Sequence, residues 1–74
     1  LLRMAKLMRR MQYMQHTEYF ALMLINDPYA KKNDSANLTL GGLLHALGSY
    51  FYEQKAYEHA LKHLQNSLEV YLRV

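Results

Sequence analysis

The stretch LHALGSYFYEQKAYEHALKHLQNSL, residues 44–68, decides how this chain folds. Its apolar residues recur every three or four positions, which is the spacing of one face of an α-helix. Two small residues, Gly48 and Ala60, lie inside these apolar stripes. The distance between two packed helices depends on the side chains at their contact, so small residues there allow a close approach. The stretch therefore predicts a helical hairpin, with helices over about residues 36–54 and 56–74 and a turn at Gln54–Ala56.

The residues before the hairpin predict a long helix and a polar linker. Residues 1–26 contain no glycine or proline and are rich in good helix formers. Pro28 disfavours helical geometry in the residue before it, so Asn26-Asp27-Pro28 should end this helix. We therefore expect an all-α chain with a flanking helix over residues 1–26, a linker loop over 27–37 and a hairpin over 38–74.

The flanking helix is amphipathic at a helical spacing of about 100° per residue. One face carries the apolar residues, and the other carries the basic ones. We expect the methionine-rich apolar face to pack on the hairpin as ordinary core, with an adaptable binding surface as the alternative. The apolar residues are Leu1, Met4, Leu7, Met8, Met11, Met14, Leu22 and Ile25, and the basic ones are Arg3, Lys6, Arg9 and Arg10.

Size and composition indicate a chain that needs contacts with other parts of a larger protein, or with another protein, to be stable. The chain has 74 residues and 51% hydrophobic residues, which allows one domain at most. A chain this small buries only about 60% of the surface that its unfolded form exposes. It has no cysteine, so neither disulfides nor thiolate metal sites can add stability, and a reducing cytoplasmic location is the default. The chain begins at Leu1 and stops at Val74 inside a helical pattern, so we expect a fragment of a longer protein.

The two halves of the chain differ in their charge. The net charge is +3, but residues 1–10 alone carry four basic residues and no acidic one. The hairpin half has equal numbers of acidic and basic residues, so it lacks the basic patch expected of a nucleic-acid-binding protein. A signal peptide or a membrane span requires an uninterrupted apolar run, and the four basic residues break up any such run in residues 1–26. We therefore expect neither segment there.

Few residues of the sequence are candidates for catalysis or metal binding. His59 and His63 are four residues apart and can share a helix face, but the zinc-protease motif requires H-E-x-x-H and no third ligand lies nearby in the sequence. We expect both to be exposed surface histidines. No Ser–His–Asp set, paired carboxylates or glycine-rich phosphate loop is evident. The sequence therefore predicts a non-enzymatic chain without cofactor or metal.

The spacing Leu44-x-x-Leu47-Gly48-x-x-Phe51, followed after nine residues by Ala60, resembles one tetratricopeptide (TPR) repeat. It is most similar to the repeats of kinesin-light-chain and nephrocystin-like proteins, and it covers about half of the chain. The terminal proline of the repeat is missing, with Leu72 in its place. The resemblance implies that these residues pack the repeat: Leu44, Leu47, Gly48, Phe51, Tyr57, Ala60, Leu61, Leu64 and Ser67.

The resemblance also implies a function in protein–protein interaction or scaffolding. The residues that would face a partner-binding groove are His45, Ser49, Tyr52 and Glu53. A clamp for a partner's terminal carboxylate would use Lys and Asn where His45 and Ser49 stand, so no such clamp is implied. The implied partner is a peptide, a helix, a neighbouring repeat or a second copy. The alternative is that the basic helix of residues 1–26 binds a membrane surface or calmodulin, with the hairpin as a spacer.

Overall fold

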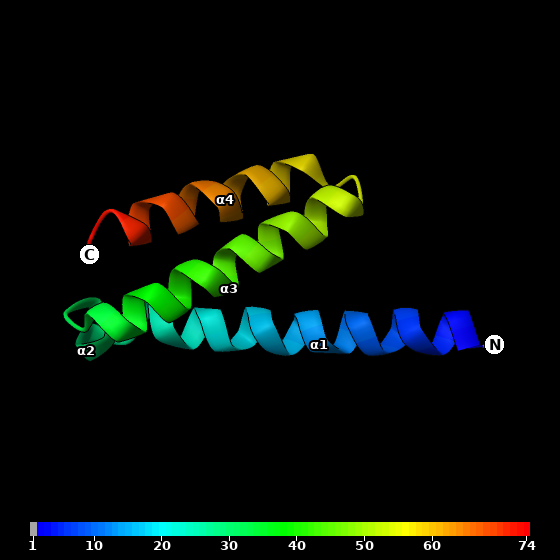
Figure 1. Cartoon of the computed structure of the whole chain (residues 1–74), viewed down its shortest axis with the longest axis horizontal. Helices are drawn as coiled ribbons and strands as arrows, with labels where there is room; N and C mark the ends of the chain where they lie inside the picture. The colour runs from blue at the N-terminus through cyan, green and yellow to red at the C-terminus, as the bar shows by residue number, and fades with distance from the viewer. Residues whose placement is uncertain (1) are drawn as a thin grey trace.

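The computed structural model describes the backbone of residues 2–74 and the side chains from Met4 onward. The described residues form four helices and no strand: α1 (Leu2–Ile25), α2 (Pro28–Lys31), α3 (Asp34–Glu53) and α4 (Tyr57–Tyr71). The expected all-α class is confirmed. In Figure 1, α3 lies between α1 and α4 and runs antiparallel to both. The first turns of α1 extend past the turn that joins α3 to α4.

Small residues bring α3 and α4 together. A Cβ atom added at Gly48 would lie 2.6 Å from the Leu64 Cγ and 3.3 Å from the carbonyl oxygen of Ala60. Near the other end of the hairpin, the Ser67 hydroxyl donates a hydrogen bond of 2.8 Å to the Gly41 carbonyl oxygen. The facing backbones are thus close enough for a side-chain-to-backbone bond in a buried position.

The turn between these helices depends on one unusual backbone conformation. Lys55 has a φ of 64°, in the left-handed region that favours glycine. The Ala56 N–H donates to the Phe51 carbonyl oxygen at 2.9 Å, which closes the end of α3. The turn therefore forms at Gln54–Ala56 without glycine, asparagine or aspartate.

Residues 27–37, expected to be a loop, instead contain α2 and the start of α3. The Asp27 carboxylate accepts a hydrogen bond from the Tyr29 N–H at 3.0 Å, and Pro28 occupies the first helical position, where it is favoured. Asn33 caps α3, because its side-chain oxygen accepts a hydrogen bond from the Ala36 N–H at 3.1 Å. The proline that ends α1 thus also begins the next helix.

The core lies where α3 meets its two neighbours. Leu44 and Leu47 are the largest fully buried side chains, each 1% exposed. Ala21 from α1 and Val70 from α4 complete the buried cluster with Leu40. The core is small, and most of it belongs to α3.

The methionine-rich face of α1 does not pack on the hairpin as expected. Met4, Met8 and Met11 are more than half exposed, and only Met14 is half-buried. The packed face carries Thr17 and Ala21 and is rotated by about a quarter turn. Small residues allow the close approach to α3, and the first turns of α1 pass beyond the hairpin.

Arg10 connects α1 to the turn end of the hairpin. Its guanidinium donates a hydrogen bond to the Glu53 carboxylate and lies 5.5 Å from the centre of the Tyr50 ring. Both contacts are at the turn end of α3. No helix in the described part of the chain has both the length and the apolar character needed to cross a bilayer.

Candidate docking surface

One side of α4 carries an apolar stripe that the described chain covers only in part. Leu64 and Tyr71 lie against Gly48 and Gly41 of α3, whereas the rest of the stripe is more than half exposed. Its residues follow one another at intervals of four, three, four and three, which is the heptad spacing of helices that pack side by side. Leu61 and Leu68 in the middle are 58% and 61% exposed. We name this set the α4 stripe: Tyr57, Leu61, Leu64, Leu68 and Tyr71.

The buried face of α4 lies beside the stripe and overlaps its edge. Ala60, Ser67 and Val70 are buried where α4 packs on α3. At about 100° per residue, Leu64 and Tyr71 lie between this buried face and the exposed row of the stripe. The exposed row is therefore a flank of α4 that α3 does not reach.

A hollow of about 320 Å³ lies at the N-terminal end of the stripe. Tyr52 of α3 and Tyr57 of α4 form its wall, with their rings in an edge-to-face contact at 5.4 Å. Ala60, Leu61 and Leu64 form the rest of the lining. The hollow is almost wholly apolar, and its dimensions suit an apolar side chain rather than a large ligand.

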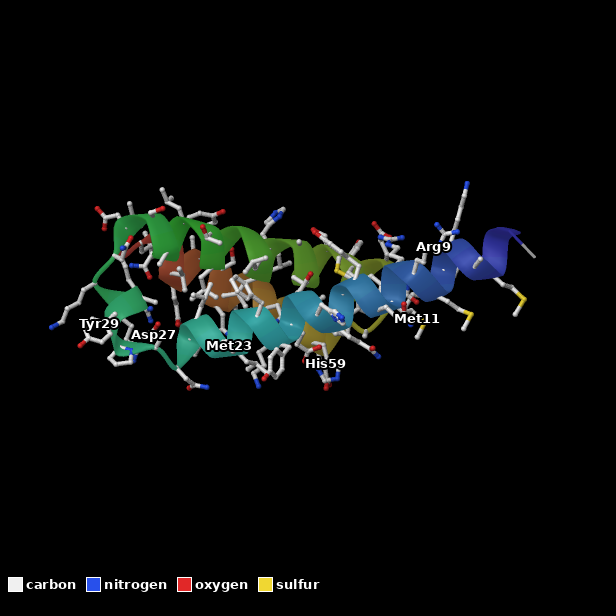
Figure 2. All side chains as sticks on the ribbon, turned by 90° about the horizontal axis from the view of Figure 1, so that it is seen from below. Arg9, Met11, Met23, Asp27, Tyr29 and His59 are labelled. Carbon is white, nitrogen blue, oxygen red and sulfur yellow. The ribbon has the colours of Figure 1, made fainter. Side chains whose placement is uncertain are left out.

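A second concave surface, the α1–α4 groove, lies between α1 and α4 with α3 as its floor. The central part has a volume of about 290 Å³. In Figure 2, α1 lies in front of this space and α4 behind it. Leu44 and Leu47 form the floor, and the walls are Glu18, Ala21, Leu22, Ile25, His59, Lys62, His63 and Asn66.

His63 differs from the expected exposed histidine, because it is half-buried in this groove. Its ring stacks on Phe51 at 5.3 Å with an angle of 13° between the planes. Its Nδ1 atom is buried and has no hydrogen-bond partner among the described residues. Desolvation by burial lowers the pKa of His63, and the nearby Glu18 carboxylate opposes this by favouring the charged form.

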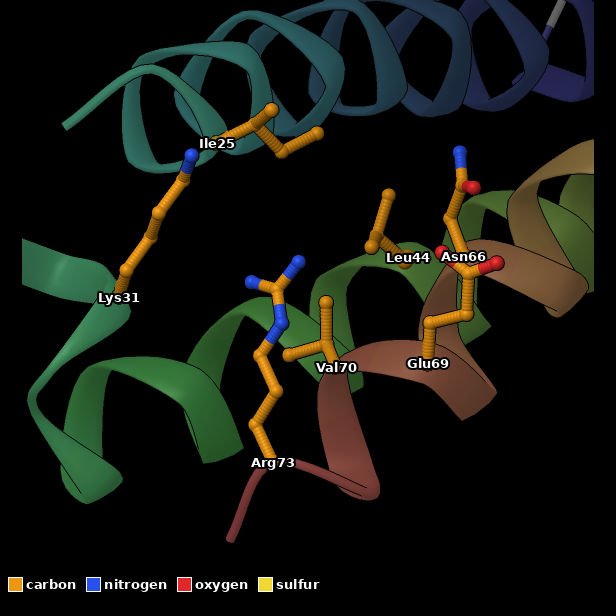
Figure 3. A pocket seen from close by; sticks show the side chains of 7 residues that line it. All are labelled: Ile25, Lys31, Leu44, Asn66, Glu69, Val70 and Arg73. Atoms are coloured by element: carbon orange, nitrogen blue, oxygen red, sulfur yellow. The ribbon is translucent and has the colours of Figure 1, made fainter. Parts of the chain in front are cut away.

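The groove continues into a pocket of about 200 Å³ near the end of α4, shown in Figure 3. Ile25, Leu44 and Val70 form its apolar part, while Lys31 and Arg73 extend into it from α2 and the C-terminus. Asn66 and Glu69 line the α4 side. Within the described residues, no three His, Asp or Glu side chains are placed to hold a metal ion.

The predicted groove residues do not line one groove. His45 and Ser49 are exposed on α3, and Tyr52 lines the hollow at the end of the α4 stripe. Glu53 instead pairs with Arg10 at the end of α1. Of the four, only Tyr52 lies on a surface where a partner side chain would be enclosed.

The nine predicted repeat-packing residues divide into three groups. Five are buried, two are half-buried, and two, Tyr57 and Leu61, are more than half exposed. Those two belong to the α4 stripe, where no described helix covers them. The buried ones are Leu44, Leu47, Gly48, Ala60 and Ser67, and the half-buried ones are Phe51 and Leu64.

The sequence interpretation missed the rest of the stripe, Leu68 and Tyr71. The signal was present, because both continue the heptad spacing that begins at Tyr57. The interpretation assigned Leu61 and Leu64 to packing inside the repeat. Leu64 does lie against Gly48 of α3, whereas Leu61 is exposed. Comparisons with protein-family models, with curated protein sequences and with solved structures find no match to this chain.

Proposed function

We propose that this chain is a protein-interaction module in which the α3–α4 hairpin acts as one TPR-like repeat. The α4 stripe is the surface that docks a helix from a partner or a neighbouring repeat. The absence of cysteine favours a reducing compartment such as the cytoplasm for this module. The proposal includes no catalytic activity.

The uncovered stripe is the observation that supports the proposal. A helical hairpin of a repeat protein cannot bury both of its faces alone, and adjacent repeats complete the core. Tyr57, Leu61 and Leu68 form a continuous row on α4 and are each more than half exposed. Contiguous exposed apolar surface of this kind marks interaction sites on soluble proteins.

The alternative function, a free basic helix that binds a membrane or calmodulin, has less support. Arg10 is engaged with Glu53 and Tyr50 instead of being available to a partner. From Met14 onward, α1 packs on the core cluster around Ala21. A peptide-like role would need α1 to leave the hairpin and expose that core.

The docking function is tested by NMR with a probe helix. The ¹⁵N-labelled chain is titrated with a synthetic amphipathic peptide that carries leucine at the a and d positions of three heptads. The backbone amides of the α4 stripe should shift, and Leu61→Lys should abolish the shifts. Met23→Lys is the matched control, because Met23 is 54% exposed on α1 and lies outside the stripe.

The two variants separate specific docking from non-specific apolar contact. Leu61 and Met23 have similar exposure, so a lysine at either position leaves the core intact. Shifts scattered over the molecule, or shifts that survive Leu61→Lys, would refute the proposal that the α4 stripe is the docking surface.

A further inference from the structure

The α1–α4 groove extends beyond its central part at both ends. Toward the end of α4 it continues into the pocket of Figure 3, which shares Ile25, Leu44 and Asn66 with the central part. Toward the turn of the hairpin it continues into a hollow of about 200 Å³, which shares Glu18 with the central part. Three hollows thus follow one another along the groove. The first two alone span residues 11–25 of α1, which is about 21 Å at 1.5 Å per residue.

The walls of the groove repeat with the spacing of a heptad. On α1, the first hollow is lined by Met11, Met14, Gln15 and Glu18, and the second by the residues seven positions further along. On α4, the second hollow is lined by His59, Lys62, His63 and Asn66, and the third again by the residues seven positions further along. Each set has the positions i, i+3, i+4 and i+7. Four residues in this arrangement form the hole that receives one protruding side chain of a facing helix.

This spacing favours a helix as the occupant of the groove. Successive hollows are seven helical residues apart, or about 10.5 Å, and a helix presents a side chain in nearly the same direction every seven residues. An extended peptide presents side chains on one face about every 6.6 Å, so it does not match the hollows. A helix in the groove would cover apolar side chains of which two, Met11 and Leu22, are 52% and 51% exposed. The others are Met14, Ile25 and Phe51, which are half-buried.

We propose that one amphipathic helix of a partner protein docks in the α1–α4 groove and completes a four-helix bundle. In Figure 1, α3 runs antiparallel to both α1 and α4, and no backbone contact joins α1 to α4 within residues 2–74. The three helices therefore occupy three corners of a bundle whose neighbours are antiparallel. The docked helix occupies the fourth corner and runs antiparallel to α1 and α4. This site is separate from the α4 stripe and goes beyond the proposed function.

Charge at one end of the groove determines the chemistry of the docked helix. Lys31 and Arg73 extend into the pocket of Figure 3, and neither forms an ion pair with another described residue. Glu69 supplies one negative charge against these two positive ones. The docked helix begins at this end, because α1 and α4 both end there. Acidic residues are favoured in the first turn of a helix, so the partner helix carries acidic residues there, which pair with Lys31 and Arg73.

NMR titration tests the docking with a peptide of this chemistry. The peptide has leucine at every seventh residue over three heptads and two glutamates in its first turn. The ¹⁵N-labelled chain carries Leu61→Lys, which places a charge in the α4 stripe, so the outcome does not depend on the proposed function. Backbone amides of α1 between Glu18 and Ile25 should shift, with a dissociation constant between about 0.1 mM and about 1 mM.

A matched pair of variants tests where the peptide binds. Leu22→Lys places a charge in the wall of the groove and should abolish the shifts, whereas Met23→Lys should retain them. The two side chains are neighbours on α1 and are 51% and 54% exposed, but Met23 lies outside the three hollows. Circular dichroism verifies that both variants are helical.

Charge reversal tests the direction of the docked helix. Replacement of both Lys31 and Arg73 by glutamate should weaken binding of the glutamate peptide about tenfold, because two pairs change from attraction to repulsion. A peptide with two lysines in its first turn should bind this double variant as tightly as the glutamate peptide binds the chain without it. Lys6→Glu with Arg9→Glu makes the same charge change at exposed positions away from the groove and should leave the affinity unaltered.

Three results would overturn the inference: no shift in α1, shifts that survive Leu22→Lys, or equal binding of the glutamate peptide after reversal of Lys31 and Arg73. Self-association of the chain that Leu22→Lys abolishes would also overturn it, because a second copy would then occupy the groove. Docking at the α4 stripe is measured with its own probe in the chain that retains Leu61. It therefore stands or fails separately.

Discussion

Gly42 and Gly48 lie on the same helix, but they have different surroundings. A Cβ atom at Gly42 would meet only the Tyr71 hydroxyl oxygen, at the ordinary contact distance of 3.7 Å. A Cβ atom at Gly48 would lie 2.6 Å from the Leu64 Cγ and 3.3 Å from a backbone oxygen of Ala60. The first glycine is therefore replaceable, whereas the second is required by the close approach of α3 and α4.

Alanine substitutions at these two glycines should have opposite effects on stability. Gly42→Ala should raise the free energy of unfolding by about 1 kcal/mol, the helix-propensity difference between the residues. Gly48→Ala gains the same propensity but forces overpacking that costs about 1–3 kcal/mol, so it should be destabilising overall. A difference of 1 kcal/mol shifts the melting temperature by about 4–8 °C in a chain of this size.

Thermal unfolding followed by far-ultraviolet circular dichroism, with a precision of about 1 °C, distinguishes a rise in melting temperature from a fall. Each variant serves as the control for the other, because both replace a helical glycine of α3 by the same residue. Equal increases in melting temperature would show that the contact at Gly48 is not tight.

His63 makes the stability of the chain depend on pH. Burial lowers its pKa below the usual 6.5, so the unfolded state binds the proton more readily than the folded state. The stabilising effect of neutral His63 is complete above about pH 6.5 and diminishes as the pH falls toward the folded-state pKa. The charged and titratable groups that face it are Glu18 from α1 and His59 and Lys62 from α4.

Urea unfolding between about pH 5 and pH 8 measures this dependence. The midpoint should fall on acidification, and His63→Gln should reduce the slope because the amide does not titrate. Ser49→Ala should retain the slope, since Ser49 is exposed on α3 and this change removes no titratable group. An unchanged slope in His63→Gln would assign the pH dependence to another group.

At the scale of the elements, the positions of the helices can be predicted from the local sequence, but the face on which each helix packs cannot. The absence of glycine and proline before Asn26 correctly indicated α1, and the pattern around Gly48 correctly placed the turn at Gln54–Ala56. These features depend on neighbouring residues along the chain. The ends of the helices were predicted less accurately than their positions. Pro28 was expected only to end the first helix, but it also begins α2.

The orientation of α1 was predicted wrongly for a physical reason. Its methionines form the more regular apolar stripe, but packing against α3 favours the small side chains of Thr17 and Ala21. Apolar periodicity locates a face by its composition and does not measure how closely that face can approach a neighbour. The residues of α4 show a related limit of periodicity: Tyr57 and Leu61 were assigned to internal packing with Leu64, but only Leu64 lies against α3.

At the scale of the whole molecule, the three long helices form an elongated body of 45 × 20 × 15 Å. Among the helices of residues 2–74, only α3 packs on both α1 and α4, and its Leu44 and Leu47 contribute most of the core. A core this small leaves stability close to its lower limit. Association through the α4 stripe would add buried apolar surface on the side of the hairpin away from α1.

The melting temperature should therefore rise when the probe helix is added. A bound helix stabilises the folded chain by mass action, because only folded α4 presents the stripe. Scanning calorimetry over about a hundredfold range of probe concentration should show this rise in the original chain and a constant melting temperature in Leu61→Lys. A melting temperature that stays constant in the original chain would contradict docking at the α4 stripe.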